Sequence, residues 1–243
     1  MWDLISEAVL APAGDRGEPP QRMKSSSPKQ KEVAVVRRER APERRKQEFI
    51  DAARKEFAKK GYGGARINDI AAHTASNKAL VYSYFGSKEA LYIAVLESVY
   101  ADIRQKEQAL QLDEAQPIDA LEALVKFTFE YYIANPEFIS ILNGENTLEG
   151  QFIKQSAQAP SLNSTIVKTL TNVLDRGVRD GVFRAGIDPV DLYFSITGLG
   201  FTYVSSRHTL GIVFGRDLMK RDALQKRLKN IVDMVLRYVT IEK

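Results

Sequence analysis

The chain has 243 residues, of which 44% are hydrophobic, and it contains no cysteine. This apolar fraction supports a packed core, whereas the lack of cysteine excludes disulfide bonds and thiolate metal sites and fits a cytoplasmic protein. No uninterrupted run of about 18 apolar residues exists, so neither a membrane span nor a membrane partner is expected.

The basic charge is concentrated at the front of the chain. Residues 1–91 carry 18 Lys and Arg against 12 Asp and Glu, whereas residues 92–243 carry 17 against 19. Residues 1–41 have no periodic apolar face, so a disordered basic arm that ends in Arg37, Arg38 and Arg40 is predicted. Such an arm can follow DNA phosphates or enter a minor groove. A solubilising tail explains the charge equally well.

Three helices, the last two of them short, are predicted before residue 86. A stripe of apolar residues favours a helix over 42–60, and a second, shorter helix is anchored by Ile70. Asn77 is placed to cap a third helix over 78–85, which is two turns long and stops at Gly86. Two short helices joined by a tight turn form the layout of a helix-turn-helix, whose second helix enters the major groove of DNA.

The sequence YSYFGSKEAL at residues 82–91 closely resembles the TetR/AcrR family of transcriptional regulators. The family pattern there is an aromatic run that ends in Phe and is followed by Ser-Lys-Glu-x-Leu; the resemblance extends over about 44–96. It implies an all-α, two-domain homodimer. An N-terminal three-helix helix-turn-helix domain would bind a double-stranded DNA operator, and a C-terminal helical domain would bind a small-molecule effector. The chain then divides into residues 1–41, 42–91 and 92–243.

The candidate base contacts lie at the start of the third helix. They are Asn77, Lys78, Ala79 and Tyr82. A Lys donates to guanine acceptors in the major groove, and Tyr82 matches a family position that touches DNA. Asn77 can instead act only as a helix cap, and Tyr82 only as a packed aromatic. Leu80 and Phe85 of the same helix are expected in the core.

Two further side chains are candidate contacts for DNA phosphates. Lys88, together with the backbone N–H groups that follow the expected cap Ser87, suits a phosphate oxygen. Arg66 stands where the family usually has a hydroxyl that touches phosphate, and it can replace that contact. The turn also departs from the family pattern, because Ala75 replaces a usual Gly and must take a backbone conformation that Gly adopts at lower cost.

The remainder of the chain is predicted to be helical throughout. A helix over 88–110 is long enough to connect the two domains. The other helices are expected over 117–134, from 136 to about 142, and over 162–179, 189–210 and 223–239. Asn135 and Asp188 each precede a proline, and this pair favours a helix start with the Asn or Asp as cap.

Aromatic residues with polar neighbours predict an effector cavity in the C-terminal domain, since a small-molecule site combines an apolar lining with a few polar anchors. The candidate effector-binding residues are Phe127, Tyr131, Phe138, Asn143, Phe201 and Arg207. Arg207 is the candidate anchor for an acid, because a guanidinium pairs with a carboxylate through two hydrogen bonds. Alternatively, Arg207 caps a helix or pairs on the surface, and the aromatic residues belong to the core.

Dimerisation is expected through the last two long helices, as the resemblance implies. Gly198 and Gly200 permit close helix approach at a cost in helix stability. The residues expected on the dimer face are Leu228, Ile231, Val235 and Leu236.

No catalytic, metal or cofactor site is predicted. The sequence has no nucleophile elbow, P-loop or metal-spaced cluster, and its two histidines, His73 and His208, lie in different domains. The expected function is a sequence-specific DNA-binding regulator, namely a repressor that a small effector releases from a near-palindromic operator. The alternatives are a DNA-binding architectural protein without an effector and a helical scaffold whose arm binds RNA.

Overall fold

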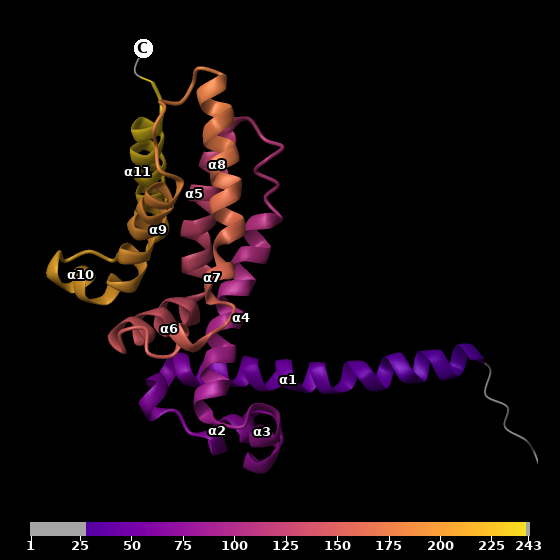
Figure 1. The fold of residues 1–243 in the computed structure, drawn as a ribbon. Helices are drawn as coiled ribbons and strands as arrows, with labels where there is room; N and C mark the ends of the chain where they lie inside the picture. The colour runs from indigo at the N-terminus through magenta and orange to yellow at the C-terminus, as the bar shows by residue number, and fades with distance from the viewer. Residues whose placement is uncertain (1–27, 242–243) are drawn as a thin grey trace, which may run out of the picture. The chain divides into compact units, whose positions relative to one another are not determined.

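The computed structural model describes residues 28–241, with side chains described from residue 42 onward. Within that range every regular element is a helix, and an isolated β-bridge joins Phe183 to Thr240 (Figure 1). The prediction of an all-α fold is therefore confirmed. Glu43–Lys243 form one compact unit, which contains the core described below. None of the described helices is both long and apolar enough to cross a membrane.

Helix α1 (Pro28–Gly64) begins well before the predicted start at residue 42. The prediction of disorder was therefore wrong for residues 28–41, while residues 1–27 lie outside the described part of the chain. Lys, Glu, Gln, Arg and Ala dominate residues 28–41, and these residues favour a helix even without an apolar face. At the other end, Gly61 takes a φ of 67°, which glycine adopts without strain.

The helix-turn-helix consists of α2 (Ile67–His73) and α3 (Lys78–Phe85), followed by the long helix α4 (Lys88–Gln108). These helices and α1 contribute buried residues to the hydrophobic core, which continues into the C-terminal helices. Its buried members include Phe49, Ala53, Phe57, Ile70, Val81 and Leu91. Lys60 also ties α1 to α2, because its Nζ lies 2.8 Å from Asp69 Oδ2 and 2.6 Å from Glu56 Oε1.

The C-terminal helices are arranged around α5 (Pro117–Ala134). They are α6 (Pro136–Thr147), the 3₁₀ turn η1 (Ile153–Gln155), α7 (Ala159–Leu162), α8 (Ser164–Arg179), α9 (Pro189–Ser205), α10 (Arg207–Val213) and α11 (Arg221–Val239). Figure 1 shows α8, α9 and α11 running alongside α5, while α4 leads from this bundle toward α2 and α3. The arrangement buries Leu121, Leu124 and Phe129 of α5.

Besides the start of α1, the ends of two helices, α6 and α9, lie several residues from the predicted ones. Helix α6 continues through Gly144 to Thr147 instead of ending near residue 142, because a single glycine weakens a helix without stopping it. The helix expected over 189–210 ends at Ser205, and α10 starts as a separate helix two residues later.

The two predicted cap-plus-proline signals have different outcomes. Asp188 caps α9 as predicted, since its Oδ1 accepts the N–H groups of Val190 and Asp191 at 2.8 and 2.9 Å. Asn135 does not cap α6, and its amide nitrogen donates instead to the Tyr131 carbonyl of α5 at 2.8 Å. Because α5 ends where α6 begins, the Asn side chain serves the end of the first helix rather than the start of the second.

Candidate DNA-binding surface and effector cavity

Helix α3 is bounded by the signals that the sequence predicted. Asn77 Oδ1 accepts the Leu80 N–H at 2.8 Å, and Gly86 ends the helix with a φ of 76°. Ser87 then caps α4, because its Oγ accepts the Ala90 N–H at 3.0 Å. The two caps fix where α3 starts and where α4 leaves it.

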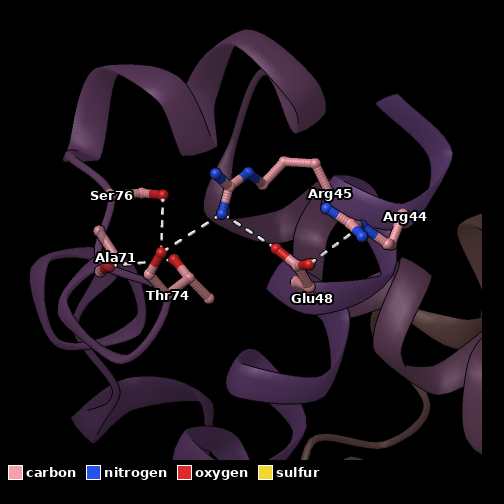
Figure 2. Close-up of polar contacts among 6 residues, drawn as sticks. All are labelled: Arg44, Arg45, Glu48, Ala71, Thr74 and Ser76. Carbon is pink, nitrogen blue, oxygen red and sulfur yellow. Dashed lines mark hydrogen bonds and ion pairs between the residues drawn. The ribbon is translucent and has the colours of Figure 1, made fainter. Parts of the chain in front are cut away.

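Hydrogen bonds within the turn between α2 and α3 set its shape (Figure 2). Ala75 takes a φ of 48°, as expected for a position that usually holds Gly. Thr74 Oγ1 donates to the Ala71 carbonyl at 3.0 Å, and Ser76 Oγ donates to the Thr74 carbonyl at 3.1 Å. Two polar side chains of the turn therefore donate to backbone carbonyls at residues 71 and 74.

Arg45 connects this turn to α1. Its Nη1 lies 3.4 Å from the Thr74 carbonyl oxygen and 2.9 Å from Glu48 Oε2, and Glu48 also pairs with Arg44 at 3.5 Å (Figure 2). No local pattern reveals the contact, since Arg45 and Thr74 are 29 residues apart. Arg45 of α1 thus helps to position the turn of the helix-turn-helix.

The exposed residues of α3 include Lys78, Ala79, Leu80 and Ser83. Leu80 is 37% exposed, so its prediction as a core residue was wrong. Val81 is 1% exposed and is the core residue of this helix instead. A two-turn helix buries only one narrow face, and in α3 that face is centred on residue 81 rather than on residue 80. Phe85 is partly buried and packs against the core, as expected.

Tyr82 and Lys78 lie one helical turn apart on α3. The Lys78 Nζ is 5.5 Å from the centre of the Tyr82 ring, a separation that permits a cation–π interaction. The Tyr82 ring is half-buried and packs against the core. It therefore contributes to packing and still presents a surface beside Lys78.

Lys88 is positioned by an aromatic ring at the start of α4. Its Nζ lies 4.6 Å from the centre of the Tyr62 ring, and the Tyr62 hydroxyl donates to Glu89 Oε1 at 2.8 Å. Burial and the hydrogen bond to Glu89 raise the pKa of Tyr62 to about 12, so this hydroxyl keeps its proton at neutral pH. Arg66 is exposed just before α2 and caps none of its N–H groups.

An aromatic junction, formed by Tyr62, Tyr92 and Phe152, joins the DNA-binding helices to the C-terminal helices. Phe152 is 2% exposed, and its ring centre lies 4.3 Å from that of Tyr62 and 5.1 Å from that of Tyr92. Glu145 of α6 holds the loop that carries Phe152, since its Oε1 accepts the N–H groups of Phe152 and Ile153 at 2.8 Å each. Helix α6 is thereby connected to the start of α4.

A cavity of about 340 Å³ lies among α4, α5, α6 and α9. Its wall is mainly aromatic and includes Tyr100, Tyr132, Phe138, Tyr193, Phe194 and Phe201. Among the described residues that line it, Arg104 alone is charged, and Asn146, Asn163 and Thr197 add polar groups. An apolar lining with a few polar groups is what a small-molecule site requires. A larger hollow beside α8, of about 710 Å³, is lined mainly by charged and polar side chains and has no aromatic wall.

Two of the six predicted effector-binding residues, Phe138 and Phe201, line this cavity. Tyr131 does not, because its hydroxyl donates to Asp102 Oδ2 on α4 at 2.7 Å. Phe127 also lies outside the wall, with its ring centre 5.7 Å from that of Tyr131.

Asn143 and Arg207 are also absent from the cavity wall. Asn143 is exposed on α6, and Arg207 Nη1 donates to the Val204 carbonyl at 2.8 Å. This helix-end contact is the alternative that the sequence left open for Arg207. The arginine that lines the cavity is Arg104 of α4, next to Tyr193 of α9, and the sequence singled out neither residue.

Arg104, Glu107 and Tyr193 form a buried polar cluster. Arg104 Nη1 lies 2.7 Å from Glu107 Oε2; the Tyr193 hydroxyl accepts a hydrogen bond from Arg104 Nη2 and donates to Glu107 Oε1 at 3.2 Å. Arg104 and Glu107 are only 8% and 3% exposed. Burial raises the pKa of Glu107 to about 7 against the opposing charge of Arg104, so near neutral pH this carboxyl neutralises the guanidinium only in part.

An exposed apolar surface, the α9–α11 face, spans the two long C-terminal helices. Phe194, Met234 and Tyr238 are 64%, 42% and 48% exposed and flank a hollow of about 430 Å³. Gly198 lies on the same face, and no atom approaches within 4 Å of the position that a Cβ would take there. Gly200 points the other way, since its Cβ would lie 3.3 Å from the Tyr132 ring.

Two of the four residues predicted for the dimer face are covered within the subunit. Ile231 and Val235 are buried, while Leu228 and Leu236 are half-buried and pack against the core. The expectation that the four cannot all be covered within one subunit holds for Leu228 and Leu236, which keep some exposed surface, whereas the placement of Ile231 and Val235 on the dimer face was wrong. Helical periodicity finds an apolar face, but it does not tell whether that face meets the same subunit or another.

The sequence matches known families in both parts of the chain. Residues 49–95 match the family model of bacterial regulatory proteins of the tetR family, and residues 117–235 match that of the tetracyclin repressor-like C-terminal domain. The HTH-type transcriptional repressor NicS of Pseudomonas putida is 39% identical over 195 residues, which cover 80% of this chain and 92% of NicS. The HTH-type transcriptional repressor SCO4008 of Streptomyces coelicolor is 30% identical over 203 residues, 80% of this chain and 98% of that protein.

Solved structures share the fold. The putative transcriptional regulator SCO4942 from Streptomyces coelicolor aligns with a TM-score of 0.60 at 26% identity, covering 79% of this chain and 97% of that one. The ketosteroid transcriptional regulator KstR2 of Mycobacterium tuberculosis reaches 0.58 at 21% identity, over 82% and 96%, which is a likeness of fold alone. Because both parts match family models and two repressors align over nearly their whole length, the chain belongs to the TetR family of bacterial transcriptional regulators.

Proposed function

We propose that the protein is a transcriptional repressor that binds a near-palindromic DNA operator as a homodimer and leaves it when a small molecule fills the cavity. The observation that carries the proposal is the aromatic junction, which connects the cavity helix α6 to the DNA-binding end of α4. The chain then divides into a basic arm (1–41), a DNA-binding domain (42–91) and an effector-binding and dimerisation domain (92–243).

DNA recognition is assigned to the start of α3 and to the helix ends beside it. The base contacts are Asn77, Lys78, Ala79 and Tyr82, and the phosphate contacts are Arg66 and Lys88. Lys78 supplies the positive charge of α3, at the end of the recognition helix that approaches base edges. Asn77 Oδ1 accepts the cap hydrogen bond, and the amide nitrogen of the same side chain is the group that can donate to a base acceptor.

Two copies are proposed to meet through the α9–α11 face. Phe194, Met234 and Tyr238 are exposed on it, and covering such side chains removes apolar area from water. Gly198 provides an open position where a partner helix can approach closely. A two-fold dimer presents two α3 helices, which must lie about 34–36 Å apart to enter successive major grooves.

Release is proposed to run from the cavity through α6 to the start of α4. Phe138 of α6 lines the cavity, and two turns later Glu145 holds the loop that carries Phe152. Phe152 packs against Tyr62, which in turn positions Lys88. A ligand that favours a shifted α6 would move this chain of contacts and populate a state with the wrong spacing for the operator. Linkage then requires the operator to weaken ligand binding by the same factor.

The test of this function begins with duplexes that the purified protein selects from genomic DNA. Fluorescence anisotropy then compares a selected duplex with a scrambled one of equal length and charge. We expect a clear preference for the selected duplex, which Lys78→Ala reduces and Lys168→Ala, a change of an exposed lysine on α8, leaves intact. Equal affinity for both duplexes would contradict a repressor and favour an architectural DNA-binding protein.

A further inference from the structure

The charges around the effector cavity point to the sign of its ligand. Arg104 lines both this cavity and a smaller hollow of about 160 Å³, whereas its partner Glu107 lines only the smaller one. Among the described residues of the larger cavity, Arg104 is therefore the one charged side chain. A guanidinium stays protonated throughout the physiological pH range. The larger cavity thus presents a positive charge in an apolar wall, which favours an anion.

The Arg104 guanidinium has donor capacity that its neighbours leave unused. Nη2 donates to Tyr193, and Nη1 lies 2.7 Å from Glu107 Oε2 as an ion pair, but neither Nη1 nor Nε, both buried, makes a hydrogen bond among the described residues. A buried donor without an acceptor is costly, so an anion that reaches this guanidinium gains more than it would at a solvated arginine. A carboxylate matches the fork of a guanidinium, because it can accept two parallel N–H groups.

The aromatic rings of the wall favour a flat molecule. Tyr132 and Phe138 are stacked, with ring centres 5.7 Å apart and planes inclined by 17°. Phe201 stands perpendicular to Tyr132, with a centre distance of 5.9 Å and an angle of 90°. Planar rings gain from such stacked and edge-on arrangements. The volume of about 340 Å³ is near the lower limit of ligand sites, which is about 300 Å³, so the ligand is small.

We propose that the cavity binds a small aromatic carboxylic acid, with its carboxylate on Arg104 and its ring among Tyr132, Phe138 and Phe201. Asn146 and Thr197 on the same wall are available to polar substituents of the ring. The inference deepens the proposed function, because it names the chemical class of the effector for the same site.

Calorimetry with simple probes tests the ligand class on the full-length protein. Benzoate and 2-naphthoate are the acids, and their amides are neutral molecules of the same shape. Benzylammonium reverses the charge, and cyclohexanecarboxylate keeps the charge but has a ring that is not planar. We expect at least one acid to bind at least tenfold more tightly than its amide, cyclohexanecarboxylate to bind more weakly than benzoate, and benzylammonium not to bind. Equal binding of acid and amide, preference for the cation, or no saturable binding of either acid would overturn the proposal.

A double variant tests the role of Arg104 without leaving a buried charge alone. Arg104→Gln with Glu107→Gln removes both charges, since loss of one partner would strand the other. We expect the acids to lose their advantage over the amides while amide binding persists, which also shows that the cavity is still folded. The matched control is Arg207→Gln, which removes a guanidinium outside the cavity wall and should retain the preference for acids. An unchanged preference in the double variant would overturn the assignment of Arg104.

Operator binding of the same preparations separates this inference from the proposed function. If neither acid binds while the protein still recognises its operator, the ligand class is wrong and the DNA-binding function stands. If an acid binds with the expected preference but does not change operator affinity, the ligand class stands and the release mechanism is wrong.

Discussion

Replacing Glu107 by Gln should change how the stability of the protein depends on pH. Burial raises the pKa of the Glu107 carboxyl from 4.5 to about 7, although Arg104 acts in the opposite direction. In the unfolded chain this carboxyl ionises near its ordinary value, whereas in the folded protein it keeps its proton until about pH 7. The folded state therefore binds more protons between these two values. The free energy of unfolding must then fall as the pH rises through this window, and it levels off above it.

The size of the effect follows from the width of the window. Each pH unit corresponds to about 1.4 kcal/mol, so the interval from 4.5 to about 7 gives a loss of at most roughly 3 kcal/mol. Glu107→Gln removes the titrating proton and should flatten the profile by up to this amount. The variant need not be more stable at pH 7, because Arg104 loses its charged partner when Glu107 is replaced.

Urea unfolding followed by circular dichroism across this pH window measures the difference between the profiles. The wild-type protein is compared with Glu107→Gln and with Glu130→Gln, which changes an exposed carboxyl of α5 and should leave the profile as it is. Wild-type and Glu107→Gln profiles that run parallel would show that Glu107 does not titrate as a buried acid. The reasoning about the polar cluster would then be refuted.

Three further predictions concern DNA binding, coupling and assembly. Lys78→Ala should reduce discrimination between operator and scrambled DNA by roughly 1–3 kcal/mol, whereas Lys88→Ala should weaken both duplexes about equally; full discrimination by Lys78→Ala in anisotropy titrations would remove the base contact. Phe152→Leu should preserve the fold, because the site stays apolar. In the wild-type protein the acid is expected to weaken operator binding by a factor in the typical range of ~5- to 150-fold, and in Phe152→Leu this factor should fall toward one. An unchanged factor in the same titrations would exclude the aromatic junction as the route. Met234→Asp combined with Tyr238→Asp should yield monomers in sedimentation, and an intact dimer would contradict the α9–α11 face.

Most helices could be placed from the sequence because their ends carry local signals. The caps at Asn77, Ser87 and Asp188 lie where they were predicted, since each depends on a side chain that reaches a backbone N–H within three residues. The start of α1 could not be placed, because residues 28–41 combine good helix formers with the charge and lack of apolar periodicity of a disordered segment. Local composition does not separate these two outcomes.

The residues of the effector cavity were harder to predict from the sequence than the DNA-binding residues, because the cavity depends on how the helices pack. The DNA-binding residues belong to one contiguous motif, whereas the cavity wall draws on four helices that are distant in sequence. Arg104 stands among charged neighbours on α4, and its burial follows only from the approach of α9 with Tyr193. The prediction that Leu80 rather than Val81 is buried failed for the same reason, because the orientation of a short helix is set by the helices around it.

Sequencing the duplexes that the purified protein retains from genomic DNA tests most directly whether it is a dimeric, sequence-specific regulator. Two copies of α3 related by a two-fold axis predict an enriched site with two inverted half-sites, whose centres lie about 10 base pairs or a multiple of this apart. Analytical ultracentrifugation of the complex should show one dimer, or a whole number of dimers, on each site. A retained pool without an enriched sequence, or a single half-site occupied by one subunit, would contradict this function.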